Sequence, residues 1–341
     1  MIEIKNLIRK NVLNLSPYTC ARDDYKGSDG VFLDANENPF GHLNRYPDPY
    51  QKELKAAISK IKGVAVENIF LGNGSDEIID LGYRVFCNPG TDKALTFSPT
   101  YGMYEASASI NDVKIIRIPL DKNFQINYKD VEPCLSDKSL KLIWICSPNN
   151  PTGNCIDRDV VEKIISGFHG VVFIDEAYID FAEGPSYKNL LNKYPNLIVM
   201  QTVSKAYGMA SVRIGMAFMN SDLVHYFNKM KPPYNISTIN QKAAMRKLAK
   251  VEDYKTQVKK IKEERTRLSS ELHKLACVEQ VYPSEANFIL IKVKDSSYMY
   301  NTLIGKEIII RNRNSVISNC LRITIGTKTE NNKLIKALKE F

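Results

Sequence analysis

Short apolar segments alternate with segments of helical pattern between about residues 48 and 220. The apolar segments span residues 69–71, 94–97, 113–118, 142–146, 171–174, 197–201 and 214–218. Strands of a parallel sheet are apolar along their whole length, because helices cover both faces of the sheet. The alternation therefore predicts an α/β fold, with a mostly parallel, doubly covered sheet in a large domain at residues 41–235. Asp48, Pro49 and Gln51 predict the start of a helix that Gly63 ends.

The pattern changes after residue 235. A long polar helical stretch reaches about Leu275, and strand-like segments follow at 287–293, 307–310 and 321–325. Thr327 and Glu330 have the spacing of a capping box that begins a last helix. We therefore expect a smaller α+β domain at residues 236–341. Residues 1–40 are too short to fold alone, so we expect an N-terminal arm that packs near the smaller domain.

The charge balance is basic, with 47 Lys and Arg against 38 Asp and Glu, a formal charge of +9. Such a balance suits anionic partners. The densest basic stretch, residues 242–274, is interleaved with acidic residues, which is typical of a solvated helix face, and no nucleic-acid motif accompanies it. Small phosphorylated ligands are therefore favoured over nucleic acid.

The sequence shows no segment typical of export or membrane insertion. No stretch approaches the roughly 20 apolar residues of a membrane helix, and the N-terminus has no small-residue cleavage site. The seven cysteines form no CxxC, and the four histidines have no metal-ligand spacing. We expect a cytoplasmic protein with free thiols, no membrane partner and no metal.

Lys205 follows the apolar segment 197–201 within the sequence Thr-Val-Ser-Lys-Ala-Tyr-Gly. Ligands of open α/β sheets bind just beyond the carboxyl ends of the strands. A lysine there, preceded by Ser204, is well placed as a nucleophile for an aldehyde. Considered alone, the segment fits a surface lysine at the start of a helix more readily.

Asp175 ends another buried-looking strand, in Val-Val-Phe-Ile-Asp-Glu-Ala-Tyr. Burial of an unpaired carboxylate is costly, so the position implies a cationic partner. A protonated pyridine nitrogen would serve, with Tyr178 three residues on as a donor to a phenolate, and a structural ion pair is the alternative. A Walker-B-like metal site is disfavoured because the chain has no GxxxxGK[ST].

Further candidate ligand-binding residues follow other strands. Asn150 lies in Cys-Ser-Pro-Asn-Asn-Pro-Thr-Gly, whose proline and glycine residues predict a turn. The glycine-containing loop 71–77 suits a phosphate at a helix N-terminus, although many such turns bind nothing. Arg213 is close enough to Lys205 to bind the same phosphate. Tyr101 could stack on a planar cofactor or be a core aromatic residue. Arg322, in a strand of the smaller domain, indicates either a bound anion or a domain-interface salt bridge.

Taken in this order, the motifs resemble those of the fold-type I pyridoxal-phosphate-dependent aminotransferases. The resemblance spans nearly the whole chain, from residues 15–18 to residues 321–327. Residues 33–39, 44–49 and 99–104 are similar, more specifically, to the histidinol-phosphate aminotransferases within that family. The resemblance implies the fold-type I architecture and pyridoxal 5'-phosphate as the cofactor.

The resemblance also implies a role for each site residue. Lys205 would hold the cofactor as a Schiff base and then transfer protons, and Asp175 would pair with the pyridinium nitrogen. Tyr178 and Asn150 would bind the phenolic oxygen, and Tyr101 would stack on the ring. The cofactor phosphate would be bound by Gly74, Ser75, Asp76, Ser204 and Arg213, and by Tyr46 of a neighbouring subunit in a homodimer.

Four residues match substrate-side positions of the family: Tyr18, Asn36, Arg311 and Arg322. Arg322 would bind the carboxylate of glutamate and also the phosphate of the other substrate. Arg313 lies two residues from Arg311, and which of the two faces the substrate stays open from the sequence.

The implied reaction is a ping-pong transamination in histidine biosynthesis. It converts L-histidinol phosphate and 2-oxoglutarate into imidazole-acetol phosphate and L-glutamate. Aromatic or broad-range aminotransferases and threonine-phosphate decarboxylases share the cofactor motifs and are the alternatives. A cofactor-sensing regulator on the same scaffold is disfavoured, since no helix-turn-helix segment precedes the motifs.

Overall fold

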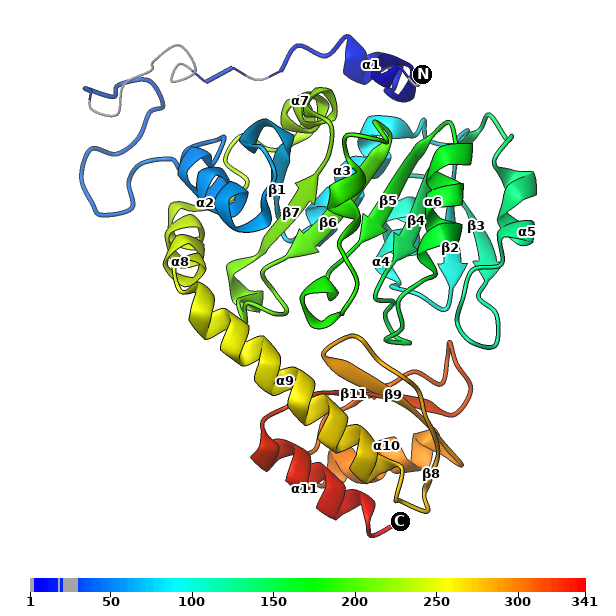
Figure 1. The fold of residues 1–341 in the computed structure, drawn as a ribbon. Helices are drawn as coiled ribbons and strands as arrows, with labels where there is room; N and C mark the ends of the chain where they lie inside the picture. The colour runs from blue at the N-terminus through cyan, green and yellow to red at the C-terminus, as the bar shows by residue number, and fades with distance from the viewer. Residues whose placement is uncertain (1–2, 18, 21–29) are drawn as a thin grey trace.

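A seven-stranded sheet forms the centre of the large domain (Figure 1). The computed structural model describes residues 3–17, 19–20 and 30–341. The strands lie in the order β1-β7-β6-β5-β4-β2-β3, and among them β7 alone runs antiparallel to its neighbours. The predicted mostly parallel α/β sheet is confirmed. The strand bounds are β1 Ile69–Asn73, β2 Lys93–Ser98, β3 Lys114–Pro119, β4 Leu140–Cys146, β5 Val171–Asp175, β6 Leu197–Thr202 and β7 Ile214–Phe218.

Helices cover both faces of this sheet, because successive side chains of a strand point to opposite faces. Ile143 and Val172 face α2, α6 and α8, whereas Trp144 and Phe173 face α1, α3, α4 and α7. Each strand therefore contributes to two separate apolar cores. The helix bounds in this domain are α1 Lys10–Leu13, α2 Lys52–Lys62, α3 Ser75–Phe86, α4 Met103–Ile110, α5 Tyr128–Val131, α6 Arg158–Gly167, α7 Ser221–Met230 and α8 Thr238–Leu248.

The small domain is built on a four-stranded antiparallel sheet in the order β10-β11-β9-β8. The long helix α9 extends from the large domain to the small one, which lies beyond the carboxyl edge of the large sheet (Figure 1). Leu268, Ile291 and Leu334 share one buried core beneath the small sheet. The bounds are α9 Val251–Leu272, β8 Val278–Val281, β9 Phe288–Val293, α10 Ser296–Gly305, β10 Arg311–Asn312, β11 Cys320–Thr324 and α11 Lys328–Leu338.

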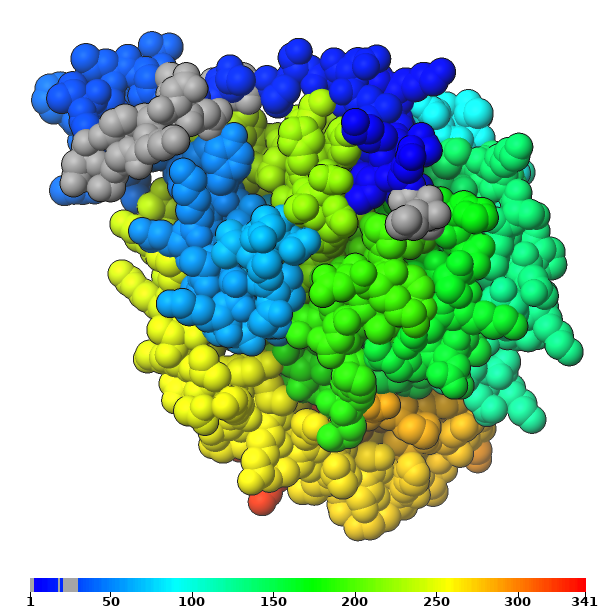
Figure 2. Space-filling view, turned by 45° about the horizontal axis from the view of Figure 1, so that its top comes forward, coloured from blue at the N-terminus to red at the C-terminus, as the bar shows by residue number. Residues whose placement is uncertain are grey.

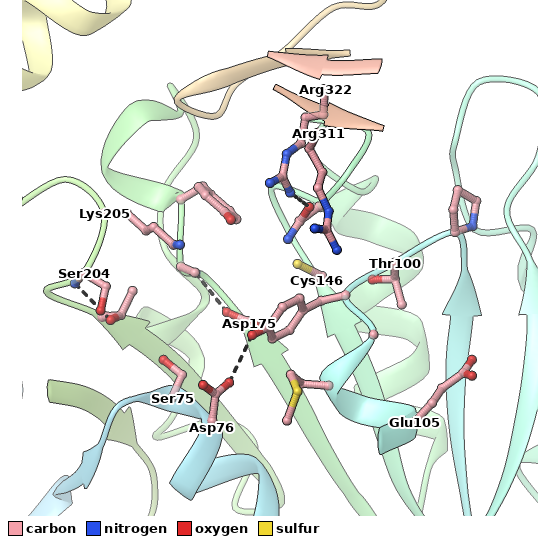
Figure 3. Close-up of a pocket in the computed structure, with 18 of the residues that line it drawn as sticks. Ser75, Asp76, Thr100, Glu105, Cys146, Asp175, Ser204, Lys205, Arg311 and Arg322 are labelled. Atoms are coloured by element: carbon pink, nitrogen blue, oxygen red, sulfur yellow. Dashed lines mark hydrogen bonds between the residues drawn. The ribbon is translucent and has the colours of Figure 1, made fainter. Parts of the chain in front are cut away.

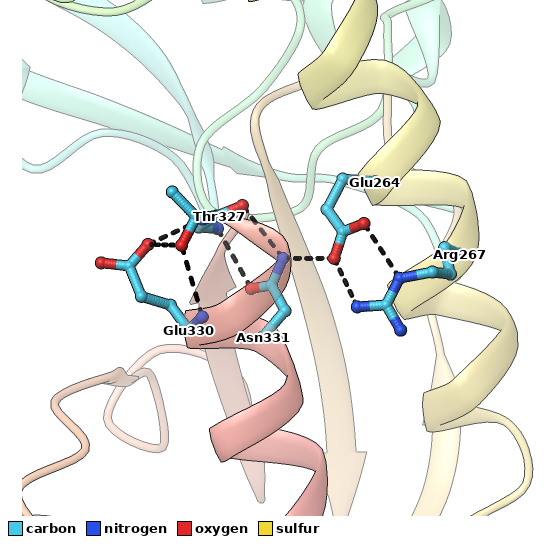
Figure 4. Close-up of polar contacts among 6 residues, drawn as sticks. Glu264, Arg267, Thr327, Glu330 and Asn331 are labelled. Atoms are coloured by element: carbon cyan, nitrogen blue, oxygen red, sulfur yellow. Dashed lines mark hydrogen bonds and ion pairs between the residues drawn. The ribbon is translucent and has the colours of Figure 1, made fainter.

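A polar network joins the start of α11 to α9 (Figure 4). The predicted capping box is present: the Glu330 N–H donates to Thr327 Oγ1 at 3.3 Å, and the Thr327 N–H donates to Glu330 Oε2 at 2.7 Å. The Asn331 amide donates to Glu264 Oε1 on α9 at 2.9 Å, and Glu264 also pairs with Arg267. The network therefore fixes the first turn of α11 against the helix that connects the domains.

Replacing Asn331 with alanine should lower the free energy of unfolding by about 1–3 kcal/mol, because buried hydrogen-bonding partners lose their bonds. Asn331 is 3% exposed and also bonds to both backbone groups of Gly326. Urea unfolding followed by circular dichroism measures the change. Asn332→Ala, at the exposed neighbouring position, is the matched control. An equal, small effect of both substitutions would contradict the role assigned to Asn331.

The N-terminal arm packs against the large domain, so the expected position near the small domain is wrong for its described residues. Ile8 and Val12 are buried in the core with α3 and α7, and the Arg9 N–H donates to the Val85 carbonyl at 3.1 Å. Figure 2 shows this dark blue segment across α7, and Figure 1 places it on the side away from the small domain. Burial of these two apolar side chains, Ile8 before α1 and Val12 within it, explains the position of the arm.

Two element boundaries also differ from prediction. Helix α2 begins at Lys52, because the buried Gln51 takes a left-handed φ of 50° and its amide donates to the Pro49 carbonyl at 2.8 Å. The strand expected at 307–310 lies instead at Arg311–Asn312. Strand β8 was not predicted, since its central Glu279 and Gln280 are exposed and give the segment a polar composition. The predicted end of α2 at Gly63 is confirmed.

All seven cysteines fall within the described residues and carry free thiols. Among these same residues, no helix has both the length and the apolar character that crossing a membrane requires.

Candidate active site

A cavity of about 700 Å³ opens between the carboxyl edge of the large sheet and the small domain (Figure 3). Parallel strands bring their carboxyl ends to one edge, which gathers residues from distant segments. In Figure 3, Lys205 and two arginines point into the cavity from different elements. The predicted residues that line it are Ser75, Asp76, Tyr101, Asn150, Asp175, Tyr178, Ser204, Lys205, Arg213, Arg311 and Arg322.

Three adjacent strands carry the central polar residues. Asp175 ends β5 and pairs in register with Cys146 at the end of β4 and with Met200 in β6. Asn150 follows β4 by a short loop, and Lys205 follows β6 in the same way. Because the three strands are parallel, a carboxylate, an amide and an amine converge on one edge of the sheet.

Asp175 is 4% exposed, and both of its oxygens accept hydrogen bonds. Oδ1 accepts from the Ala177 N–H at 3.0 Å, and Oδ2 accepts from the Tyr104 hydroxyl at 2.7 Å. Burial raises the pKa of Asp175, whereas these two hydrogen bonds lower it. Its bonded partners among the described residues are neutral, so a cationic ligand atom would supply the charge that a buried carboxylate needs.

Lys205 faces Asp175 across the cavity floor, with its Nζ 5.7 Å from the centre of the Tyr178 ring. Burial and the nearby charge of Arg322 lower the pKa of Lys205, while the carboxylates of Asp175 and Asp76 raise it. Desolvation outweighs the carboxylates, so the amine loses its proton more easily than an ordinary lysine. Such an amine can act as a nucleophile and as a proton acceptor.

A candidate anion site lies where α3 begins. Gly74 is its N-cap and has no side chain to accept from the first N–H groups of the helix, which leaves them available to an anion. Arg213 Nη2 lies 3.4 Å from Asp76 Oδ2, and Tyr101 donates to the other Asp76 oxygen at 3.1 Å. Ser204 lines the same wall. The site combines a helix terminus with a guanidinium, which suits a phosphate group.

Three arginines of the small domain face the same cavity. Arg311 and Arg322 are directly paired across β10 and β11, and Arg313 lies two residues beyond Arg311, so all three project from one face of the sheet. The sequence left open whether Arg311 or Arg313 faces the substrate cavity, and the structure places both there. Nε of Arg313 and of Arg322 has no hydrogen-bond partner among the described residues. Arg322 also donates to Asn150 Oδ1 and thereby connects the two domains.

Among the described residues, the predicted Tyr46 and Asn36 do not line this cavity within the chain. Tyr46 is half exposed and stacks on Tyr234 with ring centres 4.4 Å apart. Asn36 lies on the exposed arm in a left-handed conformation. Tyr18 lies outside the described residues. Their roles stay predictions.

The sequence motifs assign no role to Tyr104 or to Asn149. Tyr104 bonds Asp175, and Asn149 holds the loop before Asn150 through an accepted bond from Thr100 at 2.7 Å and a donated bond to Thr152 at 2.8 Å. Tyr104 follows Tyr101 by three residues, but Tyr101 precedes α4 and only Tyr104 lies in it, so helical spacing does not link the two. Nothing in the local sequence indicates the contacts of Asn149.

The family model for class I and II aminotransferases matches residues 10–338. The chain belongs to the class I and II aminotransferases. The histidinol-phosphate aminotransferase of Bacteroides thetaiotaomicron is 49% identical over 345 residues, which cover 100% of this chain and 99% of the relative. Two solved histidinol-phosphate aminotransferases are also similar. The enzyme from Clostridium acetobutylicum has a TM-score of 0.80 and 27% identity over 87% of this chain and 90% of that one. The enzyme from Sinorhizobium meliloti, solved with pyridoxal-5'-phosphate, has a TM-score of 0.78 over 87% and 83% of the two chains and, at 23% identity, shows the fold alone.

The cavity of this aminotransferase fits pyridoxal 5'-phosphate at three separate points. Lys205 offers an amine for an aldehyde, and the buried Asp175 lacks the cation that a protonated ring nitrogen would supply. The uncapped start of α3 offers N–H groups to a phosphate. A Cβ built on Gly74 would lie 2.4 Å from Arg213 Nη2, so the cradle has no room for a side chain there.

Substitution of Gly74 with alanine should weaken pyridoxal-phosphate binding about tenfold or more, a loss of about 1.4 kcal/mol or more. Gly74 has φ 78° and ψ 166°, a conformation that is strained for an alanine, and the new methyl would displace the Arg213 guanidinium. Fluorescence titration of the cofactor-free protein measures the affinity. Gly305→Ala is the control, because nothing lies within 4 Å of its added Cβ. Unchanged affinity in Gly74→Ala would remove this loop from the cofactor site.

Proposed function

We propose that this aminotransferase converts L-histidinol phosphate and 2-oxoglutarate into imidazole-acetol phosphate and L-glutamate. The observation that carries the proposal is the set of three guanidinium groups, Arg311, Arg313 and Arg322, in the same cavity as Lys205. Guanidinium forks bind phosphate and carboxylate groups with the same planar geometry. The arginine wall, formed by Arg311, Arg313 and Arg322, can therefore bind the phosphate of the first substrate and the distal carboxylate of the second. A ping-pong exchange requires such a shared site.

The cofactor would be held by residues that the cavity brings together. The first turn of α3 and Arg213 would bind its phosphate, Asp175 its ring nitrogen, Asn150 and Tyr178 its phenolic oxygen, and Lys205 its aldehyde carbon. Tyr101 would lie against its ring. When bound, pyridoxal phosphate supplies an electron sink for the charge that remains after a substrate proton is removed.

Lys205 would perform the proton transfer. Its Nζ, with a lowered pKa, would accept the proton from the substrate carbon that bears the amine and would later return a proton. The arginine wall would orient that carbon toward Nζ by holding the far end of the substrate, which reduces the entropy that the transfer has to overcome. The small domain over the cavity would limit the access of water.

A coupled assay with histidinol phosphate and 2-oxoglutarate tests the proposal, with glutamate formation as the signal. We expect kcat/KM for histidinol phosphate to exceed that for phenylalanine, and no release of carbon dioxide from threonine phosphate. A higher kcat/KM with phenylalanine would favour the aromatic or broad-range alternative. Carbon dioxide release from threonine phosphate would favour the decarboxylase.

We further propose that the active unit is a homodimer in which Tyr46 of one chain reaches the cofactor phosphate of the other. The arm at residues 30–46 carries Val31, Leu33, Phe40 and Leu43, which are 70–90% exposed in the single chain. So many large apolar side chains on one segment indicate a surface that another chain covers. A cytoplasmic location is also proposed, and the free thiols support it.

Mixed dimers test the shared site. Lys205→Ala and Tyr46→Ala homodimers should both be strongly impaired, whereas an equal mixture refolded together should regain about a quarter of the wild-type activity. The recovery arises because one site of each mixed dimer has both native residues. Mixing two Lys205→Ala preparations with different tags is the control. Absence of recovery, with mixed dimers demonstrated by tandem purification, would place Tyr46 outside the partner's site.

A further inference from the structure

The Tyr104 hydroxyl donates a 2.7 Å hydrogen bond to Asp175 Oδ2, and both residues are buried. The alternation of side chains along β5 explains why Asp175 lies next to Tyr104. Val171, Phe173 and Asp175 occupy the face of β5 that α4 covers, and Tyr104 is on the buried side of α4. Tyr104 is fully buried and belongs to the core behind the cavity. Any effect of its hydroxyl on a bound ligand therefore passes through Asp175.

The ring of Tyr104 is held rigidly. It stacks on Trp144 with ring centres 5.2 Å apart and an interplanar angle of 11°, and Trp144 stacks in turn on Phe173 at 4.1 Å. The Tyr83 hydroxyl donates to the Tyr104 carbonyl at 2.8 Å. The stacking on Trp144 thus fixes the direction of the hydroxyl toward the carboxylate, whereas the Tyr83 bond contacts the backbone alone.

The hydroxyl and a backbone N–H bind the two Asp175 oxygens, one each. A carboxylate can accept about four hydrogen bonds, so acceptor capacity is left on the cavity side. Burial raises the pKa of Asp175, and the hydrogen bond from Tyr104 is the strongest influence that lowers it. Other titratable groups that face this carboxylate are Asp76, which raises its pKa, Lys205, which lowers it, and Cys146, Tyr101 and Tyr178.

We propose that Tyr104 is a positioning residue that keeps Asp175 ionised and aimed at the ring nitrogen of the bound cofactor. The inference rests on the proposed function, because it needs pyridoxal phosphate in the cavity. A proton shared between a carboxylate and a pyridine nitrogen moves toward the stronger base. By stabilising the carboxylate form, the hydroxyl weakens Asp175 as a base and leaves the proton on the ring.

The test compares Tyr104→Phe with Tyr83→Phe in the cofactor-loaded protein. Each substitution removes one hydroxyl from a fully buried tyrosine near Trp144, but only the first removes a bond to Asp175. The readout is the nitrogen-15 resonance of ring-labelled pyridoxal phosphate, which separates protonated from neutral pyridine. We expect Tyr104→Phe to move the resonance toward the neutral value and to raise the cofactor Kd about tenfold. Tyr83→Phe should leave both near wild type.

Equal resonances in wild type, Tyr83→Phe and Tyr104→Phe would overturn the assignment while leaving the proposed function intact. Failure of the wild-type protein to bind pyridoxal phosphate at Lys205 would overturn both. If Tyr104→Phe does not fold, 3-fluorotyrosine incorporated at position 104 replaces it. Its more acidic hydroxyl should strengthen the bond to Asp175, keep the resonance at the protonated value and lower the cofactor Kd. A movement toward the neutral value, or an unchanged Kd, would contradict the inference.

Discussion

Replacing Lys205 with alanine is expected to lower kcat about 10⁴-fold, while the protein still binds pyridoxal phosphate non-covalently. The loss is large because one amine serves as both nucleophile and proton carrier, and acid–base catalysis alone contributes up to about 10⁴-fold. Binding should persist, because Asp175, Arg213 and the start of α3 line other parts of the cavity. Steady-state turnover with histidinol phosphate and 2-oxoglutarate measures the loss.

Borohydride reduction followed by peptide mass spectrometry identifies the lysine that is joined to the cofactor. Wild-type protein should show the label on the peptide with Lys205 and on no other. Lys193→Ala is a suitable control, since Lys193 is an exposed lysine paired with Glu162 at 3.6 Å, and the variant should be labelled and active like wild type. A label on a different lysine, or normal turnover in Lys205→Ala, would refute the assignment of Lys205.

Replacing Arg322 with alanine is expected to lower kcat/KM for histidinol phosphate about 10³-fold. A forked, charge-assisted pair with phosphate is worth several kcal/mol in a partly desolvated site, and each 1.4 kcal/mol corresponds to about a factor of ten. Arg322 also holds Asn150 through a direct hydrogen bond, so the cofactor side of the cavity loses a contact. The same substitution should impair the glutamate half-reaction, because the proposed mechanism assigns Arg322 to both substrates.

Three comparisons make the Arg322 result specific. Arg322→Lys keeps the charge without the fork and should recover only part of the loss. Arg246→Ala, on the exposed side of α8, should have no effect. The kcat/KM for histidinol, which has no phosphate, should fall much less in Arg322→Ala than the kcat/KM for histidinol phosphate. Equal losses for both substrates would show that Arg322 stabilises the fold or the cofactor and does not bind the phosphate.

The pH dependence supplies a further check on the same variant. The charge of Arg322 contributes to the lowered pKa of Lys205. Removal of that charge should raise the pKa of Lys205, and since the neutral amine accepts the proton, the acid limb of the kcat profile should move to higher pH.

The cofactor chemistry is predictable from the amino-acid sequence, because it depends on residue types at strand ends. Lys205, Asp175 and Asn150 each follow an apolar segment, and carboxyl ends of parallel strands share one edge of a sheet. The substrate side is less predictable. Whether Arg311 or Arg313 faces the cavity depends on the pairing of a two-residue strand, β10, with β11, and the apolar pattern predicts that strand at 307–310 instead.

The amino-acid sequence alone determined the alternating α/β pattern, the small α+β domain and the order of the chemical groups along the chain. These depend on local periodicity and on neighbouring residue types, which a sequence carries directly. The tertiary structure alone decided that the arm packs on α3 and α7, that three arginines share one face, and that Tyr104 bonds Asp175. Each of these is a contact between elements that are distant in sequence. Tertiary packing sets the register of such elements and the sides that they turn toward each other. Tyr104 and Asp175 are 71 residues apart, and no local pattern links them.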